Sequence, residues 1–452
     1  MTEVDRKFID QLIADYAQLG KTIKEIDDLY PKEVVLNLKP GDNLQAALDS
    51  LLVTGGIINL ASGLYPGVLR LTYKNKLVTI NGVDKSAQIQ GFKSGNNTGN
   101  IAFNNLAFVQ ATTPAHVQLG GDKIEMKTVA EVPSGFTFRN VDFIGPTRRA
   151  IMANCSNMTV ESCSFVDYKV FKQDSQAIIG WNGSFNHVIR DCKIEAASEN
   201  IMYGGSDAAS EDMYPRQILI ENNYFTKNFA WKGQSFNVKT LFELKNVIGL
   251  TFRGNTLDGN FQDAWGQAPA ITIKSANQEG GNLNARCENI LIEGNYIQNV
   301  GAYFIIIGRN DAGVPSGIMK NVTIYNNLCR LMNDELDGRA ISITKGPINL
   351  NINHNTMYDN RHSLVEFYDN TPCEGLQIQN NIGLHGIYGV RPTAYGMDPT
   401  FHHNAVQVKP PTSTQPQVKL GPTNVYYPDV HADLSDHVTS DGFKVGANNV
   451  FA

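Results

Sequence analysis

One eight-residue phrase, ILIEGNYI from Ile290, belongs to a set of ten related copies that recur along the chain. The other copies are IAFNNLAF from Ile101, FTFRNVDF from Phe136, MTVESCSF from Met158, HVIRDCKI from His187, ILIENNYF from Ile218, LTFRGNTL from Leu250, VTIYNNLC from Val322, LNINHNTM from Leu350 and LQIQNNIG from Leu376. Each copy begins by alternating apolar and polar residues, which is typical of a strand. Repetition at this spacing indicates a solenoid, in which each unit buries its apolar face against its neighbours.

The sixth position of the phrase indicates how the repeats stack. It is asparagine in six consecutive copies: Asn223, Asn255, Asn295, Asn327, Asn355 and Asn381. Asparagine tolerates the left-handed backbone of a tight corner, and stacked side chains of this kind can hydrogen-bond from one coil to the next. In the earlier copies the same inward position holds Cys163 and Cys192, and before them Val141 and Leu106. We therefore expect these two cysteines to be buried packing residues.

Short apolar strands follow the corners, and they predict the fold. The segments are SQAIIGW, NIMYG, TLFELK, AITIK, YFIIIG, AISIT and SLVEFY. Two or three strands per coil, with asparagine and glycine corners, predict an all-β chain folded as a parallel β-helix, and parallel crossovers are usually right-handed. The first coils are expected at VVLNL from Val34, GIINLASGLY from Gly56 and LVTINGV from Leu77. The predicted β-helix spans residues 32–398.

The two ends of the chain differ from the repeats. Within residues 1–31, apolar residues are spaced alternately three and four apart, as in a heptad seam: Ile9, Leu12, Tyr16, Leu19, Ile23, Ile26 and Tyr30. Such a helix either caps the open end of the solenoid or joins several chains. Pro31 ends it, and LKPGDNLQAALDSL predicts a second short helix that begins near Asp42 or Asn43. Residues 399–452 lose the pattern, and we expect an irregular segment that covers the last coil.

Composition excludes several classes of protein. The net charge of -6 argues against a nucleic-acid-binding protein, which would usually be basic. The sequence contains no stretch of about 18 apolar residues, so it indicates no membrane span. The first residues do not resemble an export signal. The six cysteines form no C-x-x-C motif and no ligand-like set with histidine, so we expect neither a metal site nor another cofactor.

Charged residues outside the repeat are the candidates for chemistry. Alternation in TLFELKN places Glu243 and Lys245 on the outer face, and Lys274, Arg309 and Lys345 end comparable strands. A parallel stack would set these bases in a loose column suited to an anionic or hydroxyl-rich sugar chain. An ordinary solvated face is the alternative interpretation.

Carboxylates and aromatic residues complete the predicted site. Two carboxylates that flank a glycosidic bond suffice for acid–base hydrolysis, and Asp174 with Glu243 or Asp207 is the preferred pair. A lyase would instead use a base such as Lys245 or Lys239. Substrate contacts are predicted for Trp181, Asn182, Trp231, Lys239, Lys274, Arg309 and Lys345, although the tryptophans could equally anchor loops.

Several phrases resemble a family of bacterial right-handed parallel β-helix proteins with a pectate-lyase-like fold. They include DSQAIIGWNG from Asp174, ENIMYGGSD from Glu199, VKTLFELKN from Val238, KSANQEGG from Lys274 and INHNTMYDN from Ile352. The resemblance covers about residues 38–370, and it implies the fold but little about the reaction.

A β-helix that follows a heptad helix and lacks an export signal looks like a bacteriophage tail spike or tail fibre. That likeness implies a homotrimer in the virion that binds bacterial surface polysaccharide and contacts other tail proteins through its N-terminal helix. It leaves open whether the protein also cleaves the polysaccharide as a depolymerase. For a depolymerase, a glycoside hydrolase is favoured over a lyase. A stand-alone polysaccharide lyase or hydrolase and a purely structural virion part are the alternatives.

Overall fold

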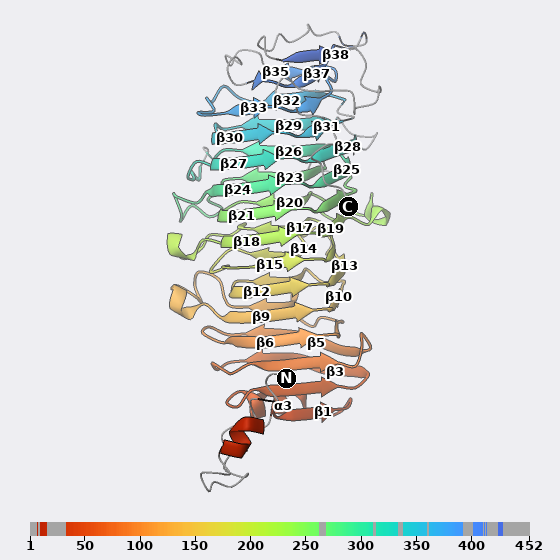
Figure 1. The fold of residues 1–452 in the computed structure, drawn as a ribbon, viewed down its shortest axis with the longest axis vertical. Helices are drawn as coiled ribbons and strands as arrows, with labels where there is room; N and C mark the ends of the chain where they lie inside the picture. The colour runs from red at the N-terminus through yellow and green to blue at the C-terminus, as the bar shows by residue number, and fades with distance from the viewer. Residues whose placement is uncertain are drawn as a thin grey trace.

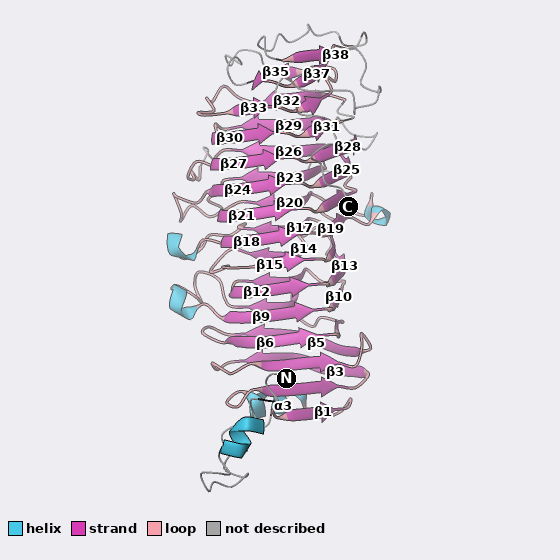
Figure 2. Cartoon of the chain, viewed as in Figure 1, coloured by secondary structure: helices cyan, strands magenta, loops and turns pink. Residues whose placement is uncertain are grey.

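The computed structural model describes residues 7, 10–15, 33–261, 268–310, 313–332, 338–358, 361–391, 401–409, 411, 413 and 424–427. These residues form a right-handed parallel β-helix whose coils stack along the long axis of the molecule (Figure 1). Strands dominate, and the few short helices lie at one end or protrude from the sides (Figure 2). The fold class predicted from the repeats is confirmed.

Three columns of parallel strands run the length of the solenoid. The first column contains the strands of the ten repeats, β6 to β33, together with β1, β2, β4 and β36: β1 (Val35–Leu38), β2 (Gly56–Leu60), β4 (Val78–Gly82), β6 (Gly99–Asn104), β9 (Ser134–Arg139), β12 (Ser156–Glu161), β15 (Val188–Arg190), β18 (Arg216–Glu221), β21 (Val247–Arg253), β24 (Cys287–Glu293), β27 (Lys320–Tyr325), β30 (Ile348–Asn353), β33 (Gln377–Gln379) and β36 (Phe401–His402).

The second column follows the asparagine corner: β7 (Ala107–Phe108), β10 (Asp142–Ile144), β13 (Ser164–Tyr168), β16 (Lys193–Ala196), β19 (Tyr224–Thr226), β22 (Thr256–Asp258), β25 (Tyr296–Val300), β28 (Leu328–Met332), β31 (Thr356–Met357), β34 (Ile382–Gly383), β37 (Ala405–Gln407) and β38 (Val425–Tyr427).

The third column completes each coil: β8 (Ala115–Leu119), β11 (Arg149–Ala153), β14 (Gln176–Gly180), β17 (Glu199–Tyr203), β20 (Thr240–Leu244), β23 (Pro269–Lys274), β26 (Ala302–Ile307), β29 (Arg339–Thr344), β32 (Ser363–Phe367) and β35 (Val390–Arg391). Near the base, the long strands β3 (Gly63–Leu71) and β5 (Ala87–Ser94) pair with each other. Strand β5 then pairs with both β7 and β8, where the second and third columns divide.

A single apolar core fills the solenoid from end to end. Each repeat contributes two inward residues, so that Ile218 aligns with Leu250, Leu250 with Ile290, and so on up the first column. These residues are almost completely buried, and one continuous cluster extends from Leu44 to Val406. Each coil therefore depends on its neighbours for burial, as expected of a solenoid.

A ladder of buried asparagines links the coils at the corner after the first column. The backbone N–H of Asn223 donates to Oδ1 of Asn255 at 2.9 Å, and that of Asn255 donates to Oδ1 of Asn295 at 2.9 Å. Each side-chain amide also donates to the next Oδ1, as from Asn295 to Asn327 at 2.9 Å. The predicted coil-to-coil bonds are confirmed, and every inward polar group at the corner has a partner.

The left-handed backbone lies one residue earlier than the sequence pattern suggested. The fifth residue of the phrase has positive φ, for example 57° at Asn222, 53° at Asn326 and 57° at His354. The fifth and sixth residues therefore have different structural roles. The fifth residue turns the chain, and the sixth then directs its side chain into the core.

The two predicted packing cysteines extend the ladder downward. The N–H of Cys192 donates to Oδ1 of Asn223 at 3.0 Å, and the N–H of Cys163 donates to Sγ of Cys192 at 3.4 Å. Both thiols are buried, and all six cysteines are free. Their expected role in packing is confirmed.

Coils continue beyond the boundary predicted at residue 398. Strand β36 pairs with β33, and β37 pairs with β34 and β38. The ladder also continues, because Asn381 donates to Asn404 and Asn404 donates to Asn424, each at 2.9 Å between N and Oδ1. The described part of residues 399–452 thus includes further rungs, in contrast to the irregular segment expected there.

Helices occupy the N-terminal end. Helix α3 (Leu44–Leu51) begins at the predicted position, where the side chain of Asn43 accepts a hydrogen bond from the N–H of Ala46 at 2.9 Å. Residues 10–15 are also helical, and Leu12 in that segment is half-buried. The other residues of the heptad seam lie outside the described residues. Within the described part of the chain, no helix is long and apolar enough to cross a membrane.

The ladder predicts a large energetic difference between two asparagine substitutions. Asn295→Ala removes donors and an acceptor that buried groups of Asn255, Phe252 and Asn327 use. We expect it to lower the free energy of unfolding by about 2 to 4 kcal/mol. Asn37→Ala removes one exposed bond to Asn59 and should cost less than about 0.5 kcal/mol. Urea unfolding of both variants measures the contrast, and equal midpoints would contradict the role of the ladder.

Candidate functional site

Charged side chains gather on the outer face of the third column, where β14, β17, β20 and β23 pass. We call this group the acid–lysine cluster. Its members come from the loop before β14, from the beginning of β17, from β20 and the residues on either side of it, and from the end of β23: Asp174, Glu199, Lys239, Glu243, Lys245 and Lys274. The register of the strands brings them together, since Glu199 aligns with Thr240 and Met202 with Glu243.

Lys239 joins two of the carboxylates. Its Nζ lies 2.5 Å from Oδ2 of Asp174 and 3.4 Å from Oε1 of Glu199. Asn237 donates its side-chain amide to Asp174 at 3.0 Å, and Gln176 donates to Oε2 of Glu199 at 2.7 Å. The Glu199 side chain is completely buried. Both carboxylates are thus held in place by several partners.

The Glu243 carboxyl has a strongly raised pKa. Burial raises the pKa of Glu243 to about 7, and Glu199 adds to the rise through its charge and a carboxyl–carboxyl hydrogen bond, while Lys245 and Lys239 oppose it. Lys245 lies 3.7 Å away, measured from Nζ to Oε1 of Glu243. A carboxyl of this kind exchanges its proton near neutral pH, as a general acid requires.

The pKa values of Asp174 and Lys239 are shifted in the directions that keep both groups charged. Burial alone would raise the pKa of Asp174, but hydrogen bonds from Lys239 and Asn237 outweigh it, and the pKa lies below its usual value. Burial would lower the pKa of Lys239, but Glu199 and Asp174 outweigh that effect and raise it. The same face therefore holds an ionised carboxylate and a protonated acid near neutral pH.

Lys274 behaves differently from Lys239. Burial lowers its pKa, and the charge of Lys245 lowers it further. Strand register places Leu244 beside Ile273, so that Lys245 and Lys274 are neighbours on adjacent coils. The predicted column of bases begins here with two adjacent lysines.

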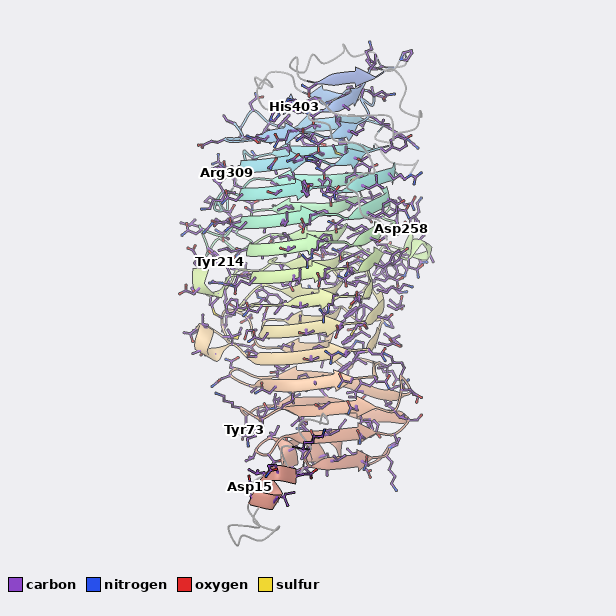
Figure 3. All side chains as sticks on the ribbon, viewed as in Figure 1. Asp15, Tyr73, Tyr214, Asp258, Arg309 and His403 are labelled. Atoms are coloured by element: carbon purple, nitrogen blue, oxygen red, sulfur yellow. The ribbon has the colours of Figure 1, made fainter. Side chains whose placement is uncertain are left out.

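The other two bases of the predicted column, Arg309 and Lys345, do not align with Lys274. Lys274 aligns with Ile307, and Ile307 aligns with Thr344, so Lys345 lies one residue further along its strand. Nζ of Lys345 lies 3.5 Å from Oδ2 of Asp369. Arg309 lies in the turn after β26, on the edge of the β-helix that also carries Tyr214 and opposite Asp258 (Figure 3).

An apolar surface adjoins the cluster and explains the burial of Glu243. Met152, Ile179 and Met202 align on successive coils, and Glu243 is the next residue in that line. Trp181 packs on Ile179 and Met202 and is 7% exposed. The carboxyl of Glu243 therefore lies at the end of a dry line of side chains, where ionisation is costly.

Three predicted site residues, Asp207, Asn182 and Trp231, anchor loops. Asp207 is buried and accepts backbone N–H groups of Glu279 and Gly281 at 3.2 and 2.9 Å. The Asn182 side chain donates to the carbonyl of Met126 at 2.9 Å and accepts from the N–H of Ala209 at 3.0 Å.

Trp231 is a loop anchor in the same sense. It is 2% exposed in a small core with Ala197, Val238 and Phe261, and its ring meets that of Phe236 edge to face at 6.4 Å. The geometry gives it, like Asp207 and Asn182, a supporting position around the cluster, and their roles in binding stay predictions.

Glu199 is the member of the cluster that the candidates from sequence did not include. It lies at the beginning of ENIMYGG, directly before the strand that was predicted there. A carboxylate at the start of a fully buried strand is costly unless it has partners. That mismatch is the signal in the sequence that identifies it.

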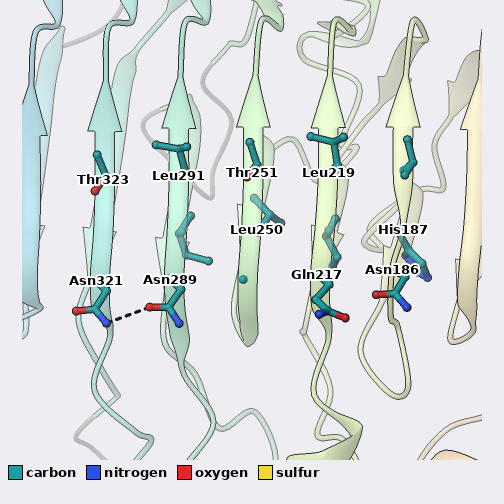
Figure 4. A pocket seen from close by; sticks show the side chains of 14 residues that line it. Asn186, His187, Gln217, Leu219, Leu250, Thr251, Asn289, Leu291, Asn321 and Thr323 are labelled. Atoms are coloured by element: carbon teal, nitrogen blue, oxygen red, sulfur yellow. Dashed lines mark hydrogen bonds between the residues drawn. The ribbon is translucent and has the colours of Figure 1, made fainter.

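A shallow hollow lies on the outer face of the first column, away from the cluster. It is lined by apolar and threonine side chains such as Leu219, Thr251 and Leu291, and by a row of residues near the starts of the strands that includes Asn289 and Asn321 (Figure 4). The amide of Asn321 donates to Asn289 at 3.0 Å. Its lining contains no carboxyl, lysine or arginine group, and its histidine, His187, is buried with its ring nitrogens bonded to the Tyr203 hydroxyl and the Cys155 carbonyl.

Among the described residues, no set of three or more histidine, cysteine, aspartate or glutamate side chains could hold a metal ion. The acid–lysine cluster instead balances its carboxylates with lysines.

The opposite pKa shifts of two carboxyls predict opposite effects on stability. The pKa of Glu243 is about 7 in the folded state and lower in the unfolded chain, so folding is penalised as pH rises between these values. Glu243→Gln should therefore stabilise the protein at about pH 8 by roughly 2 to 3 kcal/mol more than at about pH 5.

Asp174→Asn is the matched control for that measurement. The lowered pKa of Asp174 contributes stability above its unfolded value, and this is lost only as pH falls through the folded pKa. The variant should be less stable than the native protein at both pH values. Thermal unfolding at the two pH values checks both signs, and a pH-independent loss of stability in Glu243→Gln would contradict the raised pKa.

No family model matches the chain, and no curated protein matches it in sequence. Solved structures do match in fold. A mannuronic acid specific polysaccharide family 6 lyase from human gut microbiota is 14% identical, with a TM-score of 0.53, over 87% of this chain and 91% of that chain. PfbA, a surface adhesin of Streptococcus pneumoniae, is also 14% identical, with a TM-score of 0.52, over 83% and 90%.

Larger proteins match at lower TM-scores. The tailspike protein of E. coli bacteriophage HK620 is 16% identical, with a TM-score of 0.42, over 89% of this chain and 68% of that chain. The chain spans 66% of the catalytic domain of a GH87 alpha-1,3-glucanase, which matches at 12% identity and a TM-score of 0.47. The likeness to the lyase and to the adhesin agrees with the three columns of parallel strands, and the chain is a parallel β-helix protein.

Proposed function

We propose that this protein binds a bacterial surface polysaccharide along the outer face of the third column and hydrolyses a glycosidic bond there. One observation carries the proposal: Glu243, with a pKa of about 7, shares this face with Asp174, whose pKa is lowered. Glycoside hydrolases use one carboxyl as a general acid and a second as a base or nucleophile, and differing environments assign the two roles.

The residues of the cluster take separate roles in this reaction. Glu243 donates its proton to the oxygen of the leaving sugar, and Asp174, held ionised by Lys239, is the base or nucleophile. Glu199 is a positioning residue, because its carboxyl shares a hydrogen bond with Glu243 and raises the pKa of that acid. Lys245 and Lys274 contact the glycan, and the apolar surface around Trp181 receives a sugar ring.

Comparison with solved structures is compatible with this class of ligand. One matching structure is a lyase described as specific for mannuronic acid, and another is a surface adhesin. These likenesses concern the fold, so the polysaccharide ligand of this chain rests on the cluster itself.

β-Elimination is the second candidate reaction, and Lys274 favours it. A lyase needs a base that abstracts a proton from a uronate sugar, and burial together with Lys245 lowers the pKa of Lys274 toward that role. In this alternative, Lys245 neutralises the uronate carboxylate. The two reactions leave different products, so one assay separates them.

We further propose that the protein is a homotrimeric tail spike that is exposed on a bacteriophage virion and joined to other tail proteins by its N-terminal helix. The heptad spacing of residues 9–30 supports assembly of several chains. A β-helix that carries a glycan-binding face would then project outward from the particle.

A digestion assay tests the reaction. The full chain is incubated with capsule and lipopolysaccharide from a panel of bacteria, while reducing ends and the ultraviolet absorbance of new double bonds are followed. We expect reducing ends without absorbance, and a rate that falls as pH rises above about 7 because Glu243 loses its proton. Glu243→Gln and Asp174→Asn should each lower the rate by at least about 100-fold.

Asp258→Asn is the control for that assay, because Asp258 ends β22 in the second column and bonds to Tyr224 and Asn299 rather than to the cluster. Its rate should equal that of the native protein. Absorbance that grows with the reducing ends, and that is lost in Lys274→Met, would replace the hydrolase with the lyase. Binding without cleavage by any reaction would show an adhesin.

Light scattering tests the assembly. We expect the mass of three chains for the native protein, and a smaller species for Leu12→Asp, because a charge in the seam opposes helix packing. Gln11→Asp, at an exposed position beside it, should leave the mass unchanged. A monomeric native protein would contradict the proposed spike.

A further inference from the structure

We infer that a second charged group on the same face, built around Arg339, Glu366 and Arg391, binds an anionic substituent of the glycan. This arginine cluster lies further along the third column, on β29, β32 and β35. The inference deepens the proposed function and rests on it, because it specifies that the polysaccharide is acidic.

Strand register connects the two clusters along one line. From Glu243 the line passes through Thr272, Ile305 and Ser342 and reaches Glu366. These are four steps between coils, and at about 4.8 Å per step they span roughly 19 Å. An extended oligosaccharide that occupies the acid–lysine cluster would therefore reach the arginine cluster.

The arginine cluster repeats the geometry of the acid pair with reversed charge. Glu199 aligns with Thr240, three residues before Glu243 on the next coil. Arg339 aligns with Ser363, which likewise comes three residues before Glu366. The position that holds a carboxyl beside Glu243 thus holds a guanidinium beside Glu366.

Basic side chains converge on one carboxylate in this cluster. Arg339 donates Nε to Oε2 of Glu366 at 2.5 Å, and Arg391 donates Nε to Oε1 at 3.0 Å. Nδ1 of His362 lies 3.8 Å from Oε2 of the same carboxylate. Two guanidinium groups and an imidazole thus converge on the single carboxylate of Glu366.

Part of the cluster is open to a ligand. The Arg391 side chain is 43% exposed, and its guanidinium lies 4.4 Å from the ring centre of Tyr388. A guanidinium that is stacked on an aromatic ring loses little freedom when it binds an anion. The exposed donors of Arg391 therefore form a prepared contact for a planar carboxylate or for a phosphate or sulfate group.

Ser342 provides an independent indication of a ligand. It is 2% exposed and aligns directly with Glu366, and its hydroxyl has no hydrogen-bond partner among the residues that the structure describes. A buried hydroxyl without a partner is unfavourable. A polar group of a bound sugar beside Glu366 would satisfy it.

A comparison of native and neutralised glycans tests the inference. The probes are capsule and lipopolysaccharide polymers from a bacterial panel, each as isolated, after chemical reduction of its carboxylates, and after removal of phosphate or sulfate. Affinity is measured on the full chain. We expect the polymers that the protein binds to be acidic. Binding should weaken by at least about tenfold after one of the two treatments. The effective treatment identifies the anion.

Variants connect that result to the cluster. Arg391→Gln should weaken binding of the acidic polymer by about tenfold and reduce its salt dependence, with little change for the neutralised polymer. Arg253→Gln is the matched control, because Arg253 also pairs with a glutamate, Glu221, but lies on the first column with its side chain 50% exposed. It should bind as the native protein does.

Three outcomes would overturn the inference, and they are distinguishable. Equal affinity for native and neutralised polymers rejects the acidic ligand but leaves polysaccharide binding in place. Unchanged binding by Arg391→Gln, with a loss after neutralisation, moves the anion contact to another site. Retention of no polymer from the panel rejects the proposed function and the inference together.

Discussion

From Cys163 onward, the stacking of the coils depends on a hydrogen bond between the corner residue of one coil and that of the next. At the corner after the first column, the buried amides of one asparagine need the side-chain oxygen of the asparagine above, as between Asn255 and Asn295. This bond fixes the register between coils, since a slip of one residue would bury unpaired amides and turn the apolar residues outward. Glycine, asparagine or another tolerant residue turns the chain just before it.

Fixed register is also what creates the site. Residues on the outer face of the third column align at the spacing of the coils, so charges from segments far apart in sequence become neighbours. Asp174 and Lys239, for example, are 65 positions apart and form an ion pair. Next to them, Met202 aligns with Glu243 and packs in an apolar cluster with Trp181. The raised pKa of this acid costs folding energy near neutral pH.

The sequence was sufficient for the fold because periodicity survives in every repeat. The strand phrase, the inward sixth position and the N-cap at Asn43 are local patterns, and each was confirmed. The coils at Asn404 and Asn424 were not predicted, because the proline-rich stretch between them hides the period. Ladder geometry finds them, since it requires only an asparagine at the right corner.

The site was only partly predictable for a different physical reason. Glu243, Lys245 and Asp174 follow from strand alternation and from departures from the repeat, and they do lie together. Glu199 was missed because it is the first residue of its strand, where alternation does not tell which way a side chain points.

Asp207 shows the complementary limit of sequence reasoning. Its partners, Glu279 and Gly281, lie in a loop more than 70 positions away, and no local pattern connects them. Residues in loops therefore need the structure before their roles can be separated.

The most direct test of this account is the ionisation of Glu243 itself. Carbon-13 NMR of protein labelled at glutamate carboxyls, with the signal assigned by its loss in Glu243→Gln, gives the pKa without any substrate. We predict a midpoint near the value of about 7 that burial and Glu199 impose, and a downward shift in Glu199→Gln. A midpoint near 4.3, the usual value for glutamate, would contradict the account. Glu243 would then be an ordinary surface carboxylate, and the face would lack its acid.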